Sequence, residues 1–286
     1  MSSEWEVVVD AGAVLGEGPH WDGERLWWVD IEGHLIHRTD VGDRSDEVID
    51  VGEKVSSVIP RRGGGFVAGY PDGVGFHGAD GRHETRLLIE ESDAHSRMND
   101  AKCDPLGRLY TGTMTQGGAS SALYRVDHDL GVSTVVDGVG ISNGLGWSPD
   151  GTRMYYIDTP TQRLDVFDYD PQRGRCENRR PLIDFSQRAG YPDGLTVDAE
   201  GCIWVALWTG WAVHRFDPEG GLMQQISLPV SKPTSCAFGG PDLDRLFITS
   251  ASVELSDAEL ADQPLSGALF EVSPDCRGQP GVPFDG

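Results

Sequence analysis

The pentapeptide Gly190-Tyr-Pro-Asp-Gly194 opens a pattern that recurs along the chain. Eight residues after Asp193 comes Gly201, which closes the turn Asp198-Ala-Glu-Gly. An apolar run, Cys202-Ile-Trp-Val-Ala206, follows at once. Pro-Asp-Gly by itself is an ordinary turn sequence, so the pentapeptide alone indicates little.

Two earlier stretches repeat this layout. Asn143 is followed eight residues later by Gly151, and Asn99 is followed eight residues later by Gly107. Each of these glycines also closes an Asp-containing turn and precedes a short apolar run. Self-similarity at a regular spacing is the mark of a repeat architecture.

Further units complete the series. Glu17 occupies the leading position of the first unit, although Gly23 follows it at a spacing two residues shorter. The second unit leads near Ser56, which is not a carboxylate or amide, and the sixth leads near Thr234. Six units of roughly 40 to 50 residues, each with about four short strands, predict an all-β, six-bladed β-propeller. We expect it to form a single domain over residues 1–286; a β-sandwich, the other all-β candidate, does not explain the repeat.

The two ends of the chain are expected to meet in the last blade. The sixth unit is one strand short, and the strand predicted at Trp5-Glu-Val-Val-Val-Asp10 has no partner before it. Pairing the N-terminal strand with the last unit would remove an open sheet edge. One short helix is expected near 256–261.

Composition excludes several functions. The 286 residues include 38 Gly and 17 Pro and carry a net charge of −23, which argues against a nucleic-acid partner. No apolar run is long enough to span a membrane, and the first residues do not resemble a signal peptide. Five cysteines without a metal-binding spacing suggest buried free thiols and a reducing compartment, so we expect a cytoplasmic protein. We also expect a monomer or a weak homo-oligomer.

The leading residues of the units predict a site. In a propeller the first strand of each blade lines the central channel, so Glu17, Asn99, Asn143 and Asp193 should converge at one end of it. Two carboxylates and two amides in one cavity need a cation or ordered water. Oxygen ligands disfavour zinc and favour calcium, magnesium or manganese, with ferrous iron also compatible.

Simpler interpretations compete with this site. Each Asn or Asp that precedes Gly or Asp can be a turn former. His20 and His214 are interpreted as core or rim residues rather than ligands. For Trp208 and Trp211, a pocket wall and ordinary packing are equally compatible with the sequence.

The chain resembles the SMP-30/gluconolactonase/regucalcin-like family over nearly its full length. The segments that carry the resemblance, specific in this order, are Leu15-Gly-Glu-Gly-Pro-His-Trp21, Arg97-Met-Asn-Asp-Ala101 with Gly112-Thr-Met114, Ile141-Ser-Asn-Gly-Leu145, Tyr191-Pro-Asp-Gly194, and Cys236-Ala-Phe-Gly-Gly-Pro-Asp-Leu-Asp244 with Thr249-Ser250. The resemblance implies a six-bladed propeller that holds one divalent metal and hydrolyses a sugar lactone. Calcium, magnesium, manganese, zinc and iron occur among members, and we expect calcium here.

The resemblance also implies residue roles. Glu17, Asn143 and Asp193 match the metal ligands of the family. Arg97 matches an arginine that holds the substrate, and Asn99 matches a residue that contacts the substrate or completes the metal shell. Animal members carry acidic residues soon after Gly-Thr-Met that contact the substrate, whereas this chain has Gln116 there. That contact is therefore either missing or replaced by Gln116, which we include among the expected substrate-binding residues.

A mechanism follows as a hypothesis. A divalent ion would polarise the carbonyl of a glucono- or pentonolactone, and Asp193 would act as the catalytic base toward water. The stretch Ala206-Leu-Trp-Thr-Gly-Trp211 is similar to bacterial aldonolactonases, including pentonolactonases. Hydrolysis of a phosphotriester or another ester on the same scaffold, and a non-catalytic calcium-binding propeller, are the alternatives.

Overall fold

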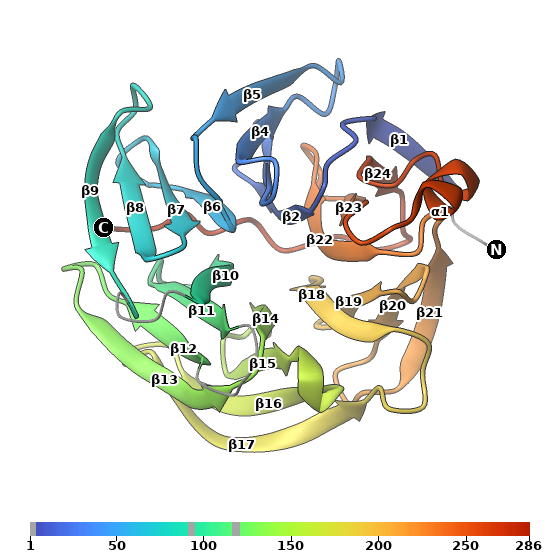
Figure 1. Cartoon of the computed structure of the whole chain (residues 1–286). Coiled ribbons are helices and arrows are strands. Elements are labelled where there is room, and N and C mark those ends of the chain that lie inside the picture. The colour runs from blue at the N-terminus through green and yellow to red at the C-terminus, as the bar shows by residue number, and fades with distance from the viewer. Residues whose placement is uncertain (1–3, 91–94, 116–120) are drawn as a thin grey trace.

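Six four-stranded antiparallel sheets surround a central channel in the computed structural model, which describes residues 4–90, 95–115 and 121–286 (Figure 1). The arrangement is a six-bladed β-propeller, as the repeat predicts. In blades one to five the strands follow one another from the channel outward. The five blades, in chain order, contain β2 (Gly16–Trp21), β3 (Leu26–Asp30), β4 (Leu35–Thr39) and β5 (Asp46–Asp50); β6 (Ser57–Pro60), β7 (Phe66–Tyr70), β8 (Gly73–His77) and β9 (His83–Leu88); β10 (Ser96–Cys103), β11 (Leu109–Thr115), β12 (Ser121–Val126) and β13 (Val132–Val139); β14 (Ser142–Trp147), β15 (Arg153–Asp158), β16 (Arg163–Asp170) and β17 (Arg175–Asp184); β18 (Tyr191–Val197), β19 (Ile203–Trp208), β20 (Ala212–Phe216) and β21 (Leu222–Ser227).

The sixth blade joins the two ends of the chain. Its inner strands come from the C-terminal part, and β1 pairs with the outer edge of β24, as predicted (Figure 1). The ring of Trp5 packs edge-on against Phe270 with centroids 5.7 Å apart, so side-chain packing accompanies the backbone pairing. The strands of this blade are β1 (Trp5–Val9), β22 (Pro233–Gly239), β23 (Arg245–Ser250) and β24 (Leu269–Val272).

Two short helices lie outside the sheets. The 3₁₀ helix η1 (Thr159–Thr161) follows β15, and α1 (Asp257–Asp262) lies between β23 and β24. The α1 helix begins after Ser256, whose side chain accepts from the backbone N–H of Glu259 in a capping box. The predicted helix is therefore confirmed. No helix within the described residues is long and apolar enough to cross a membrane.

The C-terminal segment runs across the channel, on the face away from the predicted site (Figure 1). The Nε2 atom of Gln279 donates to the carbonyls of Trp147 and Val197, in blades four and five, at 3.1 and 3.2 Å. Phe284 is fully buried, and its backbone N–H donates to the carbonyl of Pro60 in blade two. The segment therefore joins blades that are far apart in the sequence.

All five cysteines are free, and Cys103, Cys202 and Cys236 are buried, as expected. The apolar faces of neighbouring blades form the core between them. One such cluster combines Trp204 and Val213 of blade five with Ile248 and Phe270 of blade six.

Candidate active site

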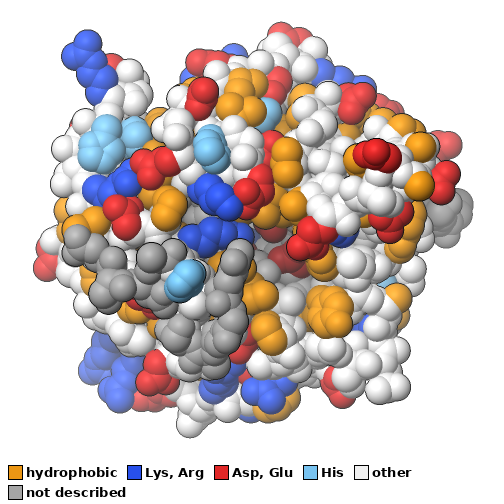
Figure 2. Space-filling model, in the orientation of Figure 1, with side chains coloured by type: hydrophobic (Ala, Val, Ile, Leu, Met, Phe, Trp, Pro, Cys, Tyr) orange, Lys and Arg blue, Asp and Glu red, His pale blue; other side chains and the backbone are white. Residues whose placement is uncertain are grey.

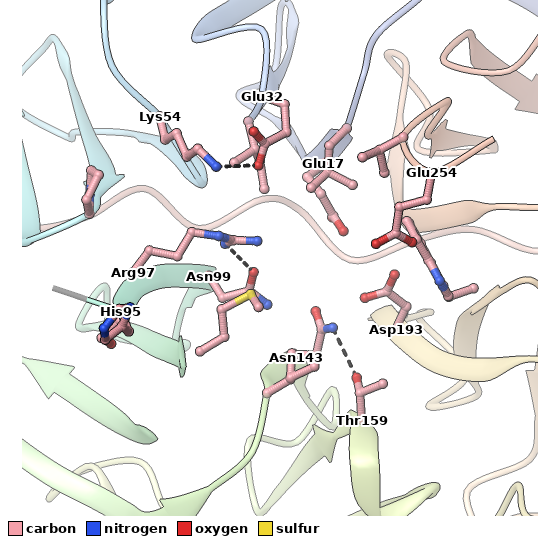
Figure 3. A pocket seen from close by; sticks show the side chains of 18 residues that line it. Glu17, Glu32, Lys54, His95, Arg97, Asn99, Asn143, Thr159, Asp193 and Glu254 are labelled. Atoms are coloured by element: carbon pink, nitrogen blue, oxygen red, sulfur yellow. Dashed lines mark hydrogen bonds and ion pairs between the residues drawn. The ribbon is translucent and has the colours of Figure 1, made fainter. Parts of the chain in front are cut away.

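A cavity of about 530 Å³ opens at one end of the channel (Figures 2 and 3). Glu17, Asn99, Asn143 and Asp193 line it, although they come from four different blades. Arg97 lines it as well. Figure 2 shows basic and acidic side chains gathered around the hollow on this face. The convergence predicted from the repeat is present, while the roles of these residues in binding and catalysis stay predictions.

Each of the four leading residues lies at a break in strand pairing. The register shifts between Glu17 and His20 in β2, between Met98 and Ala101 in β10, between Ser142 and Leu145 in β14, and between Pro192 and Leu195 in β18. Such β-bulges re-aim side chains and are frequent beside active sites. In blade two, β6 pairs with β7 without a shift, and that blade supplies no leading carboxylate or amide. The turn-former interpretation is wrong for these residues, because each lies within a strand.

The amide of Asn143 is oriented by a chain of hydrogen bonds. The hydroxyl of Thr159 donates to the carbonyl of Pro192 at 2.8 Å, so its lone pairs remain free to accept. The Nδ2 of Asn143 donates to this hydroxyl at 3.1 Å. The Oδ1 of Asn143 therefore faces the cavity, where it can serve as a ligand (Figure 3).

The charged forms of the two carboxylates of the site are disfavoured by burial and by neighbouring negative charge. Burial raises the pKa of Glu17 well above its ordinary value, and the nearby carboxylates of Asp193 and Asp100 raise it further. Burial and then the charge of Asp100 raise the pKa of Asp193 well above its ordinary value, while Asn143 and Arg97 act in the opposite direction. A cation bound between the carboxylates would reverse this penalty.

Arg97 and Asn99 form a coupled pair. One nitrogen of the Arg97 guanidinium donates to Oδ1 of Asn99 at 2.7 Å, and Nδ2 of Asn99 donates to the carbonyl of Ser142 at 2.8 Å. Both polar atoms of the Asn99 side chain are therefore engaged, and its oxygen is less available to a metal than that of Asn143. Burial lowers the pKa of Arg97, which still leaves a cation beside the two carboxylates.

Glu17, Asn143 and Asp193 fit a divalent metal. They offer two buried carboxylates and one pre-oriented amide oxygen, which is a donor set that calcium, magnesium or manganese prefers. Burial and neighbouring negative charge raise the pKa of both carboxylates, so a bound cation would favour their charged forms. The charge of Arg97 lowers the pKa of both carboxylates, and its guanidinium is tied to Asn99.

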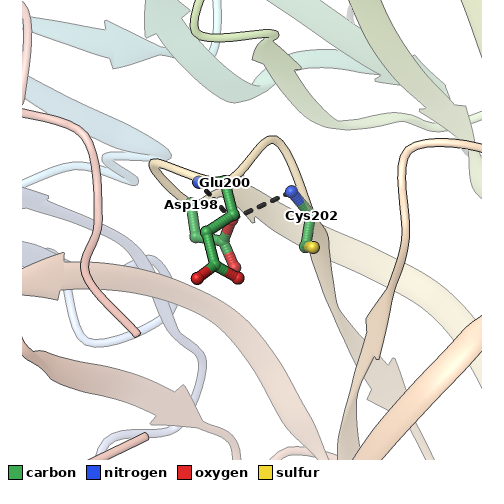
Figure 4. A group of neighbouring side chains, drawn as sticks. All are labelled: Asp198, Glu200 and Cys202. Carbon is green, nitrogen blue, oxygen red and sulfur yellow. Dashed lines mark hydrogen bonds between the residues drawn. The ribbon is translucent and has the colours of Figure 1, made fainter. Parts of the chain in front are cut away.

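A second group of possible ligands lies elsewhere in blade five (Figure 4). Ligand atoms of Asp198, Glu200 and Cys202 come within 4.8 Å of one another. Arg215 already donates to Oδ2 of Asp198 at 2.7 Å and to Oε2 of Glu200 at 2.6 Å. Oδ1 of Asp198 accepts from the backbone N–H groups of Glu200 and Cys202, which closes the turn. This group is best explained as the internal ion pair of a turn.

Comparison with known proteins agrees with this geometry. Residues 15–252 match the family model described as the SMP-30/Gluconolactonase/LRE-like region. The chain belongs to this family. Over 283 residues it is 39% identical to the putative sugar lactone lactonase YvrE of Bacillus subtilis, and the match covers 97% of each chain.

Two further relatives extend the comparison. The pentonolactonase XacC of Haloferax volcanii is 36% identical over 280 residues, which is 96% of this chain and 95% of that protein. A crystal structure of regucalcin from Agrobacterium tumefaciens, described as a calcium-binding protein, superposes with a TM-score of 0.95 at 28% identity and covers 99% of this chain and 98% of that one. The resemblance drawn from the sequence motifs is therefore confirmed.

The remaining sequence predictions for this SMP-30/gluconolactonase family member have mixed outcomes. Trp208 lines the cavity, whereas Trp211 is 45% exposed and is not among the lining residues. His20 and His214 are buried away from the cavity, as expected, and burial lowers the pKa of each to about 4. Gln116 lies outside the described residues.

Charged groups at the rim of the cavity carry no signal in the sequence. Glu32 pairs with Lys54 at 2.7 Å, and Glu254 lies 3.5 Å from Lys232 (Figure 3). Glu32 lies in the connection between β3 and β4, Lys54 lies in the connection between β5 and β6, and Glu254 follows β23. These connections do not share the repeat, so position within a unit gave no signal for them.

Proposed function

We propose that the protein hydrolyses the ester bond of a sugar lactone, a glucono- or pentonolactone, to the aldonic acid with the help of one divalent metal ion. The observation that carries this proposal is the convergence of Glu17, Asn143 and Asp193 on one cavity beside Arg97 and Asn99. Its volume of about 530 Å³ suits a monosaccharide-sized substrate. The lactonases among the relatives support the same reaction class.

Glu17, Asn143 and Asp193 are the proposed metal ligands, and calcium is the ion we expect. A divalent ion bound there would act as a Lewis acid that stabilises negative charge developing on the lactone carbonyl oxygen. Magnesium, manganese, zinc and ferrous iron are the other candidates, and the oxygen-rich ligand set argues against zinc.

The side chains of the protein have separate tasks. Asp193 would take a proton from the water that attacks the carbonyl carbon, and the ring C–O bond then breaks as the ring oxygen gains a proton. Arg97 and Asn99 would hold substrate oxygens, because their mutual hydrogen bond fixes their orientation. Gln116 is the proposed further contact in this group.

The test is hydrolysis of a panel of aldonolactones by chelator-treated protein that is reloaded with calcium, magnesium, manganese, zinc or ferrous iron. We expect metal-restored turnover, and loss of that turnover by at least about 10³-fold in Asp193→Asn. Near-normal rates in Asp193→Asn would remove Asp193 from the mechanism. Turnover of an organophosphate but of no lactone would favour the phosphotriesterase alternative, and tight metal binding without turnover would favour a calcium-binding propeller.

A further inference from the structure

One charged pair in the wall of the cavity has no role in the proposed chemistry. Glu254 lines the cavity, and its carboxylate points toward the side where Asp193 lies (Figure 3). Lys232 lies behind it, with Nζ 3.5 Å from Oε2 of Glu254. The Glu254 side chain is 74% exposed, so its oxygens are open to a ligand, whereas that of Lys232 is only 6% exposed.

Lys232 is held in place by its surroundings. Its ammonium donates to the carbonyl of Val253 at 2.6 Å and lies 4.6 Å from the ring centroid of Trp208, another residue of the cavity wall. The backbone N–H of Val253 donates to the carbonyl of Val14 at 2.9 Å, which ties the loop to the first blade. The loop that carries Glu254 is therefore anchored from two sides.

The backbone of Glu254 is unusual. Its φ of 59° lies in the left-handed region that favours glycine. An L-residue costs about 1–2 kcal/mol in that conformation. The chain therefore places a long acidic side chain at a position where glycine would be less strained.

The other charged groups of the cavity are already engaged. Glu17 and Asp193 are proposed metal ligands, and Arg97 holds Asn99 at 2.7 Å. Glu32 is paired with Lys54, also at 2.7 Å, which is closer than the contact of Glu254 with Lys232. Among the described residues of the cavity wall, Glu254 is the carboxylate most open to a new hydrogen bond.

We propose that Glu254, supported by Lys232 and beside Trp208, is a specificity-determining subsite that binds hydroxyl groups of the lactone. This inference rests on the proposed function and extends it to residues outside the metal site. Sugar hydroxyls donate to a carboxylate in charge-assisted hydrogen bonds. The cation of Lys232 offsets the repulsion that Glu254 would otherwise feel from Glu17 and Asp193.

The subsite selects a polyhydroxylated substrate. A lactone without hydroxyl groups leaves the Glu254 carboxylate without a donor, so it gains nothing from the subsite. A site built around a polar partner discriminates against analogues that lack it. Hexono- and pentonolactones should therefore depend on Glu254, whereas an unsubstituted ring should not.

The test compares Glu254→Gly and Glu254→Gln with the unmodified enzyme, loaded with the metal that supports turnover. We expect KM for a sugar lactone to rise about three- to tenfold in both variants, while kcat stays within about twofold. The inhibition constant of γ-butyrolactone, which has no hydroxyl groups, should not change. If γ-butyrolactone fails to bind any of the enzymes while KM rises, the hydroxyl groups carry the binding, which also supports the subsite.

Stability separates binding from folding. Glycine suits a φ of 59°, so Glu254→Gly should keep or raise Tm. Asn178→Gly, at an exposed residue with φ of 53° far from the cavity, is the matched control and should leave KM unchanged.

Three results would overturn the inference. One is an unchanged KM in both variants, and another is an equal loss for the sugar lactone and for γ-butyrolactone. A collapse of kcat would instead make Glu254 part of the chemistry. Absence of lactone turnover in the unmodified enzyme would contradict the proposed function itself, so the two failures are distinguishable.

Discussion

Glu17 and Asp193 illustrate how a single site sets chemistry against stability. Both carboxylates are drawn into one cavity, and burial together with neighbouring negative charge raises the pKa of each. A folded protein tolerates such a pair because the rest of the fold fixes their positions. The same uncompensated negative charge favours the binding of a divalent ion between the two carboxylates.

Replacing one of these carboxylates should stabilise the metal-free protein. Because the pKa of Asp193 is raised on folding, the metal-free folded state binds more protons than the unfolded chain, and the free energy of unfolding falls as pH rises above about 4. We expect Asp193→Asn to flatten this fall and to raise the free energy of unfolding at pH 7 by about 1 kcal/mol or more. Thermal unfolding in the presence of chelator from pH 4 to 8 measures this pH dependence. A steeper fall of the free energy of unfolding in Asp193→Asn than in the unmodified protein would contradict a raised pKa for Asp193.

Thr159 is predicted to orient a ligand without touching the metal. Thr159→Val removes the hydroxyl that accepts from Asn143 and donates to Pro192, so the Asn143 amide can rotate. We expect metal affinity to fall about 10- to 100-fold, as for other residues that orient ligands. Calorimetric titration with calcium measures the change. Thr161→Val is the control, since that hydroxyl donates to the carbonyl of Asp158 on the same 3₁₀ helix; an equal loss there would point to the helix as a whole.

At the scale of strands, the sequence predicted which strand positions carry the polar residues, but not the β-bulges that direct their side chains into the channel. Asn99, Asn143 and Asp193 share a spacing to a turn glycine, and that spacing placed them on equivalent inner strands. The β-bulges that aim them into the channel depend on pairing with the next strand, which no local pattern encodes. Glu32 and Glu254 lie in loops without a repeat, so only the folded chain reveals that they reach the same cavity.

The inner strands approach each other closely enough to require glycine. A Cβ on Gly144 of β14 would lie 2.5 Å from the carbonyl oxygen of Asp193 on β18. Backbone on both sides leaves no flexible group to yield, so Gly144→Ala should cost about 1–3 kcal/mol of stability and displace Asp193. Denaturant unfolding and metal affinity report the two effects. Gly63→Ala, where a Cβ would meet nothing within 4 Å, is the matched control and should be neutral.

For the whole molecule, counting repeats was sufficient to predict the ring and its closure. The strand predicted at Trp5–Asp10 lacked a partner and the sixth unit lacked a strand, and β1 does pair with β24. The C-terminal crossing was not predictable. Gln279 and Phe284 contact blades distant in sequence, and a segment rich in Gly and Pro with isolated apolar and polar residues has no periodicity to reveal its partners.

Ring closure by β1 makes a last prediction about the molecule as a whole. A chain lacking residues 1–10 would expose the edge of β24 and lose the packing of Trp5 on Phe270 and the buried Val8. We expect Tm to fall on the order of 10 °C and the exposed edge to promote self-association, seen by size-exclusion chromatography. A synthetic peptide of residues 4–10 should pair with β24 as the missing strand, which should restore Tm and prevent self-association. A scrambled peptide of the same composition should not, because alternate side chains must match the edge; equal rescue by both would mean that the blade does not need this strand in its register.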